Sequence, residues 1–322
     1  MTVTKNGWQP FRTLLLATSL VVIVTGCATP FDVQGHRGAR GLAPENTLPA
    51  FAKAMDLGVT TLELDIGITA DDVVVIAHDP KLNPNLMRNA QGEYVGTSTP
   101  TLRSLRYEEI ARYDVGRLKP DSNYAKQFPH QVAMDRTPIP RLQDLFALVK
   151  ARGDSKTRFN IETKIRPDAP NDTADAQTFV RLLIDVIRQE GMLSRVSIQS
   201  FDWRTLQLVQ QQTPAIPTVY LSIQQPTFNT ITGSNALSWT AGLSLAADGS
   251  VPALVKRAGG AVWSPHYKDL TPDSLKQATQ LGLKVIPWTI NDAKDMQALM
   301  DMGVHGIITD RPDLLIKLRA TR

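Results

Sequence analysis

The sequence predicts an α/β fold, a (β/α)8 barrel of the TIM type, with a β-hairpin arm after the second strand and an insertion at about residues 80–140. Strand-like and helix-like segments alternate along the chain, which is typical of a parallel sheet with helical crossovers. Nine segments are strand-like, but the second and third are separated by three residues, too few for a parallel crossover. Setting that returning strand aside leaves eight, the number that closes a barrel.

The strand-like segments are short apolar runs, and several of them end in polar or charged side chains. In a barrel of this kind the carboxyl ends of the strands form the active face. The nine segments cover residues 32–36, 60–69, 73–79, 157–165, 195–200, 217–222, 261–265, 283–290 and 305–310.

Helical patterns fill most of the gaps between the strands. The first helix follows Thr47, a plausible N-cap, and stops at Gly58, a residue type that favours helix C-termini. The other expected helices cover residues 173–189, 203–212, 251–258, 272–281 and 293–302.

The hairpin arm has a predictable register. A turn centred near Asp71 places Asp65 opposite about Ala77, with His78 beside it. The arm should therefore return His78 to the level of Glu63 and Asp65.

Two segments interrupt the strand–helix repeat. Residues 80–140 are long and of mixed polarity, and residues 224–250 are rich in Ser, Thr and Gly. Both follow strand ends at the active face, so a lid or substrate-selecting role and simple surface decoration are both open readings.

Three acidic residues fall in or near the ends of apolar strands. Glu63 and Asp65 alternate with leucines, so both carboxylates share one face, and Glu162 repeats the pattern in "FNIETK". Charges inside a barrel are costly unless they are paired. An all-oxygen ligand set favours a hard divalent cation, Ca²⁺ or Mg²⁺. The alternative is that the acids form interior ion pairs with Arg37, Arg166 or Lys164.

Histidine and basic residues accompany these acids. His36 and His78 end their strands at the same mouth and are candidates for general acid–base catalysis, since histidine titrates near neutral pH. Arg37 and Lys164 would bind a phosphate, Arg through a planar fork and Lys as a point charge. Three nearby glycines would let the backbone approach a ligand closely: Gly35, Gly38 and Gly41.

Several function classes lose support. The formal charge of +4 is mild and no long Lys/Arg run is present, so nucleic acid is not an expected partner. The chain has no GxxxxGK[ST], no GxGxxG and no GxSxG motif. Composition sets no oligomeric state.

Residues 1–26 are expected to be a lipoprotein signal peptide. Lys5 and Arg12 form a positive region, and the apolar run Leu14–Val24 is shorter than the roughly 17 residues that span a bilayer. "VTGC" ends in Cys27, the only cysteine, and resembles a lipobox. The resemblance implies a lipid on Cys27 and a membrane anchor, whereas the alternative is a plain signal peptide.

The mature chain, residues 27–322, is expected to be one barrel domain. The lipobox predicts a protein of the cell envelope, lipid-anchored on the periplasmic side. Ala28 favours the outer membrane in a Gram-negative cell.

The quoted motifs occur together in one order. They are "HRG", "PENT", "AFAKA", "LELDI", "TADDVVVIAHD", "NIETK", "WTIN" and "GIITDRP", and the match covers residues 34–312. In this order they resemble the glycerophosphodiester phosphodiesterase family, which implies a barrel of the phospholipase-C-like phosphodiesterase type. Family members often have Gly where this chain has Asp72, so the hairpin turn could differ.

The resemblance also implies roles for individual residues. Two histidines would carry acid–base catalysis, three acids would hold a metal, two basic residues would bind phosphate and two strand-end residues would line the pocket. These residues are, in that order, His36 and His78; Glu63, Asp65 and Glu162; Arg37 and Lys164; and Gln199 and Trp288.

The implied activity is metal-dependent hydrolysis of glycerophosphodiesters to sn-glycerol 3-phosphate and an alcohol. Two alternatives are a phospholipase-type phosphodiesterase acting on intact membrane lipids and a surface binding lipoprotein without turnover. The sequence leaves open the alcohol, the native metal, and whether water or the glycerol 2-hydroxyl is the nucleophile.

Overall fold

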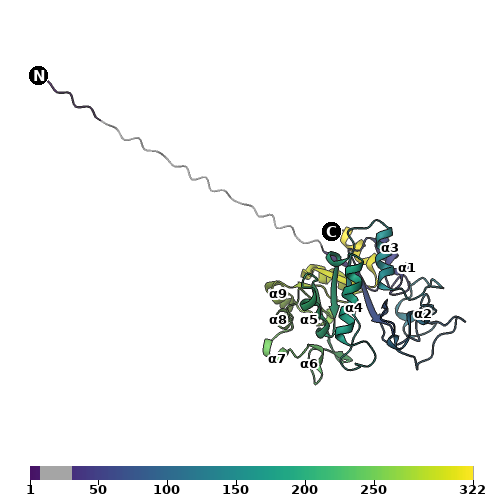
Figure 1. Ribbon diagram of the computed structural model, residues 1–322. Helices are drawn as coiled ribbons and strands as arrows, with labels where there is room; N and C mark the ends of the chain where they lie inside the picture. The colour runs from purple at the N-terminus through teal and green to yellow at the C-terminus, as the bar shows by residue number, and fades with distance from the viewer. Residues whose placement is uncertain (8–30, 322) are drawn as a thin grey trace. The chain divides into compact units, whose positions relative to one another are not determined.

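The computed structural model describes residues 1–7 and 31–321, and residues 1–7 have no regular secondary structure. The following description concerns residues 31–321, which contain every helix and strand of the described chain (Figure 1). Among the described residues, no helix combines the length and the apolar character needed to cross a membrane.

Eight parallel strands of the described chain form the barrel, as the sequence predicts. Their spatial order is β10-β9-β6-β5-β4-β2-β1-β11, so each strand lies beside its neighbours in chain order. The strands are β1 (Asp32–Gly35), β2 (Thr61–Ile68), β4 (Arg158–Thr163), β5 (Val196–Ser200), β6 (Thr218–Ser222), β9 (Val262–Pro265), β10 (Lys284–Val285) and β11 (Gly306–Thr309).

The barrel closes through irregular backbone hydrogen bonds. The expected strand at 283–290 is regular only at β10, because Pro287 has no N–H with which to continue a ladder. The chain beyond it still pairs with the last strand. Ile308 N donates to Pro287 O at 3.0 Å, and Ile290 N donates to Ile308 O at 3.1 Å.

The hairpin arm has the predicted direction and register. β3 (Val74–Ile76) runs antiparallel to β2, and Ala77 N donates to the carbonyl of Asp65 at 3.0 Å. Asp72 in the turn has a left-handed φ of 60°, the conformation that glycine adopts most readily. The turn therefore keeps a glycine-like backbone despite the aspartate.

The expected helices form close to their predicted bounds. Thr47 caps the first helix by accepting a hydrogen bond from Ala50 N, and Gly58 ends it with φ 88°. These helices are α1 (Leu48–Leu57), α4 (Ala176–Gln189), α5 (Trp203–Gln212), α8 (Val251–Arg257), α9 (Pro272–Gln280) and α10 (Ala293–Met302).

Two further helices complete the outer layer and were not expected from the sequence. They are α3 (Leu142–Ala151), which precedes β4, and α11 (Pro312–Ala320), which follows β11. In α3, Leu142, Leu145 and Phe146 are buried on one face, a helical spacing that the sequence does carry.

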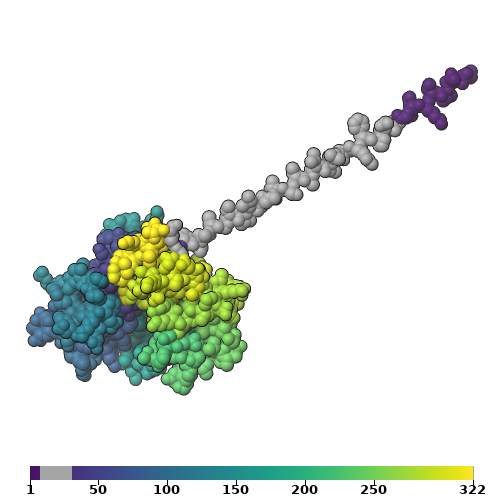
Figure 2. All heavy atoms as spheres, turned by 180° about the vertical axis from the view of Figure 1, so that it is seen from behind, coloured from purple at the N-terminus to yellow at the C-terminus, as the bar shows by residue number. Residues whose placement is uncertain are grey.

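The two interrupting segments fold against the barrel. Figure 2 shows residues of the 80–140 insertion in blue and teal as a lobe beside the yellow C-terminal helices. The insertion has its own apolar cluster and holds α2 (Tyr107–Ile110) with two 3₁₀ turns, Leu102–Ser104 and Ala125–Gln127. Residues 224–250 hold β7 (Gln224–Gln225), β8 (Phe228–Asn229), α6 (Ala236–Trp239) and α7 (Leu245–Asp248). Two more 3₁₀ turns lie elsewhere, at Leu193–Arg195 and Tyr267–Asp269.

Side-chain alternation along β2 separates the apolar core from the site. Leu62, Leu64 and Ile66 are fully buried in the layer between strands and helices. Glu63 and Asp65 point the other way, into the barrel. The strand thus delivers two carboxylates to the barrel interior, as predicted.

Candidate active site

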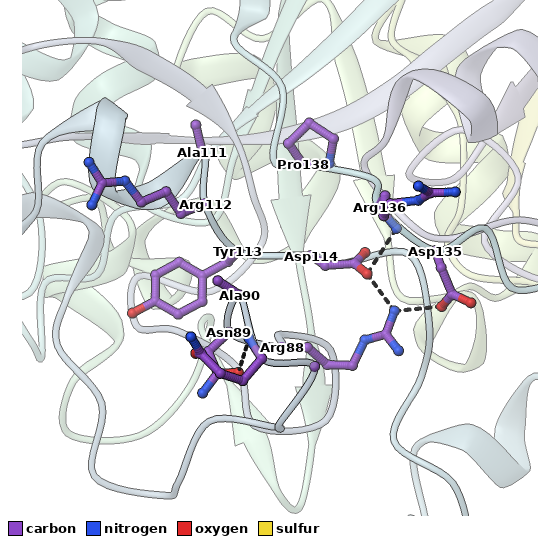
Figure 3. Close-up of a pocket in the computed structure, with 12 residues that line it drawn as sticks. Arg88, Asn89, Ala90, Ala111, Arg112, Tyr113, Asp114, Asp135, Arg136 and Pro138 are labelled. Atoms are coloured by element: carbon purple, nitrogen blue, oxygen red, sulfur yellow. Dashed lines mark hydrogen bonds and ion pairs between the residues drawn. The ribbon is translucent and has the colours of Figure 1, made fainter.

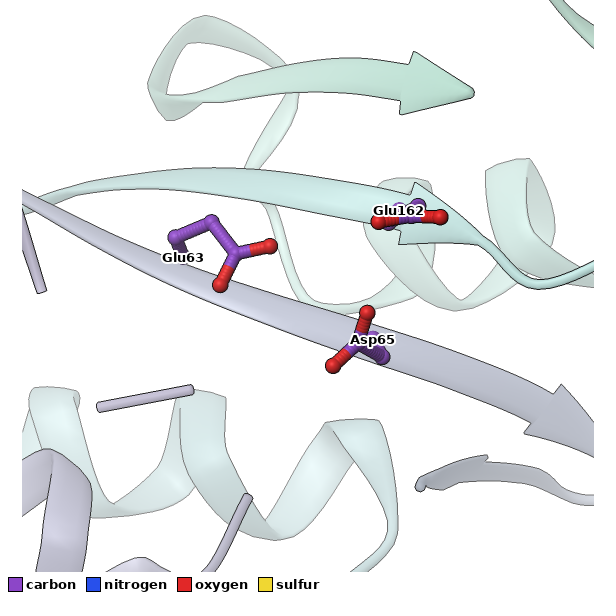
Figure 4. Close-up of side chains that lie close together, drawn as sticks. All are labelled: Glu63, Asp65 and Glu162. Atoms are coloured by element: carbon purple, nitrogen blue, oxygen red, sulfur yellow. The ribbon is translucent and has the colours of Figure 1, made fainter. Parts of the chain in front are cut away.

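Three carboxylates meet inside the barrel. The parallel register pairs Asp65 of β2 with Glu162 of β4, and Glu63 lies one pleat earlier. Figure 4 shows the three side chains turned toward a common space, and one oxygen of each lies within 4.8 Å of the others. Glu63 and Asp65 are each 1% exposed and Glu162 is 7% exposed. The sequence prediction that these acids converge is confirmed.

Each acid has a different set of neighbours. Gln199 Nε2 donates to Glu63 at 2.7 Å, and Asn46 Nδ2 donates to Asp65 Oδ2 at 2.9 Å. Within residues 31–321, no hydrogen-bond donor reaches the buried Oδ1 of Asp65. A carboxylate oxygen without a donor, close to two more carboxylates, is an arrangement suited to a cation.

The pKa shifts of the three acids also support a cation site. Burial, reinforced by the neighbouring Asp65, raises the pKa of Glu63 well above its ordinary value. Burial also raises the pKa of Glu162 to about 7, although Lys164 opposes the shift. For Asp65, burial pushes the pKa upward, but its basic neighbours together, Arg37 first among them, outweigh burial, so the pKa lies below its usual range. Three acids of which two resist ionisation fit a divalent cation, which would compensate their charge.

The alternative of interior ion pairs is partly realised. Lys164 Nζ lies 2.7 Å from Glu162 Oε1 and 3.8 Å from Asp65 Oδ1. Arg37 Nε lies 3.2 Å from Asp65 Oδ2. Arg166 instead pairs with Asp168 at 2.7 Å. Two of the three suggested basic partners therefore contact the acids.

His36 lies just beyond β1 and is held by a carboxylate. Its Nδ1 is 2.7 Å from Asp310 Oδ1, and Nε2 is 3.9 Å from Glu63 Oε2. Burial, followed by the positive charge of Arg40, lowers the pKa of His36 to about 4. A neutral imidazole must donate from Nδ1 to the carboxylate, which leaves Nε2 as its basic atom.

His78 follows the hairpin arm and has a parallel arrangement. Its Nδ1 is 2.8 Å from Asp79 Oδ1, and its Nε2 accepts from Lys164 Nζ at 3.1 Å. Burial, followed by the charges of Arg37 and Lys164, lowers the pKa of His78. Both predicted histidines are thus neutral near pH 7, each with a carboxylate at Nδ1.

Arg37 anchors the loop between the strand and the first helix. Its backbone N donates to Glu63 Oε2 at 2.8 Å, and its Nη1 donates to Glu45 Oε1 at 2.6 Å. The hydroxyl of Tyr124, from the insertion, also donates to Glu45. One residue of the 80–140 segment therefore supports the site directly.

A cavity of about 150 Å³ collects these side chains at the carboxyl ends of the strands. Gln199 and Trp288 line it, as predicted, and Trp288 is fixed by donation from Nε1 to Ser264 O at 3.0 Å. Asp65 belongs to the acid cluster but does not line the cavity itself. Cys27, the predicted lipidation site, falls outside the described residues. The other predicted residues that line the cavity are His36, Arg37, Glu63, His78, Glu162 and Lys164.

Five residues of the site were not assigned from the sequence. They orient or neutralise the predicted ones, and all lie in or beside the quoted motifs "HRG", "PENT", "IAHD" and "TDRP". Their position within the motifs was the available signal, but their partners are distant in sequence. These residues are Arg40, Glu45, Asn46, Asp79 and Asp310.

The glycines near His36 have a packing role in the structure. A Cβ added to Gly38 would meet the carbonyl carbon of Ala50 at 2.8 Å, and one on Gly41 would meet Asp310 O at 2.6 Å. A Cβ on Gly35 would meet Gly38 O at 2.1 Å. These glycines let the loop pack on α1 and on residue 310.

A larger cavity, of about 570 Å³, lies in the insertion and contains none of the predicted site residues (Figure 3). Arg88 crosses it and pairs with both Asp114 and Asp135. These three charged side chains of the cavity are therefore already paired with one another.

Together the fold and the site define a (β/α)8-barrel enzyme, with acidic, imidazole and anion-binding side chains at the carboxyl ends of the strands. The model of the glycerophosphoryl diester phosphodiesterase family matches residues 36–314. The chain belongs to this family.

Two relatives and one solved structure illustrate the similarity. A glycerophosphodiester phosphodiesterase of Caldanaerobacter subterraneus subsp. tengcongensis is 28% identical over 89% of this chain and 96% of its own. One from Bacillus subtilis is 27% identical over 88% of this chain and 85% of its own. A crystal structure of a protein named after this family, from Silicibacter pomeroyi DSS-3, is 33% identical with a TM-score of 0.80, covering 90% of this chain and 94% of that one.

Proposed function

We propose that this protein hydrolyses glycerophosphodiesters to sn-glycerol 3-phosphate and an alcohol, in a reaction that depends on a divalent cation. One observation carries the proposal: two imidazoles, each bonded at Nδ1 to a carboxylate, line the same cavity as two of three converging acids. The names of the two bacterial relatives support the substrate class.

The acids Glu63, Asp65 and Glu162 would hold the cation, Ca²⁺ or Mg²⁺. When bound, such a cation supplies Lewis-acid polarisation of a phosphoryl oxygen. Lys164, now close to Glu162, adds a positive charge at the same place. These groups would favour the charge that grows on phosphate in the transition state.

The two imidazoles would carry the proton transfers. His36 presents Nε2 as a base, while Asp310 at Nδ1 stabilises the imidazolium that forms. His78 has the same arrangement with Asp79 and stands beside Lys164. One histidine would deprotonate the nucleophile, and the other would protonate the departing alkoxide.

The test is release of sn-glycerol 3-phosphate from glycerophosphocholine by the chain lacking residues 1–27. We expect His36→Ala and His78→Ala each to lower kcat by about a hundredfold or more. His130→Ala is the matched control, since His130 is exposed and lies in the insertion. Turnover near the wild-type rate in either site variant would contradict the two-histidine mechanism.

We also propose that the protein is anchored in the cell envelope by a lipid on Cys27, on the periplasmic side. The support is the sequence alone, because Cys27 lies outside the described residues. Metabolic labelling with a palmitate analogue should label the wild type and not Cys27→Ser. An unlabelled wild-type protein would indicate a plain signal peptide.

A further inference from the structure

A second cavity, of about 330 Å³, adjoins the first. Five residues line both: His78, Glu162, Lys164, Phe201 and Trp288. A bound molecule can therefore extend from the acid cluster into the second cavity past His78 and Lys164.

The second cavity is more aromatic than the first. Phe201 and Phe228 have ring centroids 5.5 Å apart, and Phe228 and Trp239 are 5.3 Å apart. Trp288 continues the row, 5.3 Å from Phe201. Two isoleucines complete the apolar wall, Ile165 and Ile223.

The two cavities differ in the charged side chains that line them. His36, Arg37 and Arg40 line only the first cavity, whereas Asp79 and Arg166 line only the second. The charged first cavity suits the glycerol hydroxyls and the phosphate. The ester oxygen on the other side of the phosphorus would then face His78, with its alcohol in the aromatic cavity.

Positive charges already lie close to the aromatic rings. The Arg166 guanidinium is 6.0 Å from the ring centroid of Phe228 and 5.8 Å from that of Trp239. Lys164 Nζ is 5.9 Å from the Phe201 centroid. A quaternary ammonium in this cavity would compete with these cations for the same rings.

The charged side chains around this cavity already have partners. Asp79 accepts from Asn83 at 2.6 Å and pairs with His78, Glu162 pairs with Lys164, and Arg166 pairs with Asp168. Aromatic surface with resident cations favours an uncharged apolar group.

Resting on the proposed function, we propose that the second cavity binds the leaving alcohol, and that it selects an uncharged, branched or aromatic alcohol over choline. His78 is then the histidine on the side of the leaving group. Residues 224–250, through Phe228 and Trp239, determine the alcohol specificity.

The test compares glycerophosphocholine with its neutral isostere, the 3,3-dimethylbutyl ester of glycerol phosphate. The two alcohols share shape and differ by one charge. We expect a higher kcat/KM for the neutral ester in the wild type, by about tenfold. Choline is the less basic leaving group, so intrinsic reactivity works against this result.

Variants separate the effect of the cavity from the intrinsic reactivity of the two esters. The intrinsic reactivities cancel when the ratio of the two kcat/KM values, neutral ester to choline ester, is compared between wild type and variant. Arg166→Gln should shift the ratio toward choline at least threefold. Trp239→Ala, or Phe228→Leu if that variant does not fold, should lower kcat/KM for the neutral ester more than for choline. Leu237→Ala, an exposed neighbour on the same helix, is the matched control.

Three results would overturn the proposal. The first is a kcat/KM for the choline ester that equals or exceeds that for the neutral ester in the wild type, together with an unchanged ratio in Arg166→Gln. This result would show that the cavity does not discriminate between charged and neutral alcohols. A lysophospholipid turned over faster than both esters would assign the cavity to an acyl chain. Absence of glycerol 3-phosphate from every ester would instead refute the proposed function and the inference that rests on it.

Discussion

At the residue scale, the site depends on carboxylates that hold its histidines. Asp310 is the clearest case, because it contacts His36 across 274 positions of sequence and is itself held by Arg40 Nε at 2.8 Å and Asn291 Nδ2 at 2.7 Å. A carboxylate fixed in this way sets both the ring orientation and the tautomer of the histidine.

Asp310→Asn should therefore lower kcat about 10- to 100-fold, with little change in KM, because an amide can stabilise the wrong tautomer. Steady-state kinetics on glycerophosphocholine provides the measurement. Asp313→Asn serves as the control, since Asp313 pairs with Arg311 near the same helix start. Equal kinetics in the two variants would show that Asp310 does not orient the catalytic base.

The buried His36 also predicts a pH dependence of stability. Its folded-state pKa is about 4, whereas an unfolded histidine titrates near 6.5. Between these values the unfolded chain binds the extra proton, so the stabilisation present above pH 6.5 is lost as the pH falls toward 4. The free energy of unfolding should fall by about 2 kcal/mol from this group at pH 5. Urea unfolding of wild type and His36→Gln at pH 7.5 and 5 measures it, and equal pH dependence in both would contradict the assignment.

The place of a residue in the site was predictable where it follows from side-chain alternation along a strand. Glu63 and Asp65 are separated by one leucine in an apolar strand, so their shared face follows from the sequence. Asp79 and Asp310 were not assigned, because nothing local distinguishes a carboxylate that holds a histidine from one on the surface. Their roles arise only when the barrel brings distant strand ends together.

At the element scale, the loop from β1 to α1 has a strict steric requirement. Gly38 and Gly58 share a left-handed φ, 85° and 88°. A Cβ at Gly38 would meet Ala50 at 2.8 Å, whereas nothing lies within 4 Å of a Cβ at Gly58. The two glycines therefore separate backbone strain from packing.

Gly58→Ala should cost about 1–2 kcal/mol of unfolding free energy, from the left-handed backbone alone. Gly38→Ala should cost about 1–3 kcal/mol more, from overpacking against α1. It should also lower kcat, since Gly38 adjoins Arg37. Equal stability of the two variants, measured by denaturant unfolding, would mean that the loop is not packed as described.

The elements were predictable to different degrees. Thr47 and Gly58 mark their helix because capping is local chemistry. The strand at 283–290 was overestimated, although Pro287 within the apolar run is a sequence signal that interrupts a ladder. The helix α3 was overlooked although its spacing is amphipathic.

At the scale of the whole molecule, a line of amide side chains connects the two ends of the barrel. Gln34 Nε2 donates to Asp32, and Asn160 Nδ2 donates to both Gln34 Oε1 at 2.9 Å and Gln199 Oε1 at 2.8 Å. Gln199 Nε2 then donates to Glu63 at 2.7 Å. This line fixes the direction in which Gln199 points its amide hydrogens.

Asn160→Ala leaves two buried amide oxygens without a donor, so it should cost about 2–4 kcal/mol of stability. It should also weaken cation binding roughly 10- to 100-fold, because Gln199 can turn away from Glu63. Calorimetric titration and denaturant unfolding measure the two effects. Ser197→Ala is the control, since Ser197 donates to Asn160 at 3.0 Å but lies off this line. Wild-type affinity in Asn160→Ala would refute a positioning role.

The barrel as a whole could be predicted from the alternation of strand-like and helix-like segments and from the one short turn after the second strand. The placement of the two interrupting segments did not, because their packing depends on long-range contacts such as that of Tyr124 with Glu45. These segments shape the surroundings of the site, while the strands supply its reactive groups.

The most direct test of a cation-dependent hydrolase is chelation of the chain lacking residues 1–27, followed by restoration with Ca²⁺ or Mg²⁺. Release of glycerol 3-phosphate should vanish on chelation and return with one of the two ions. Asp65→Asn and Glu162→Gln should remain at least a hundredfold below wild type after restoration, because each removes a proposed ligand. Full turnover in the chelated wild type would contradict the three-carboxylate site as a cation centre.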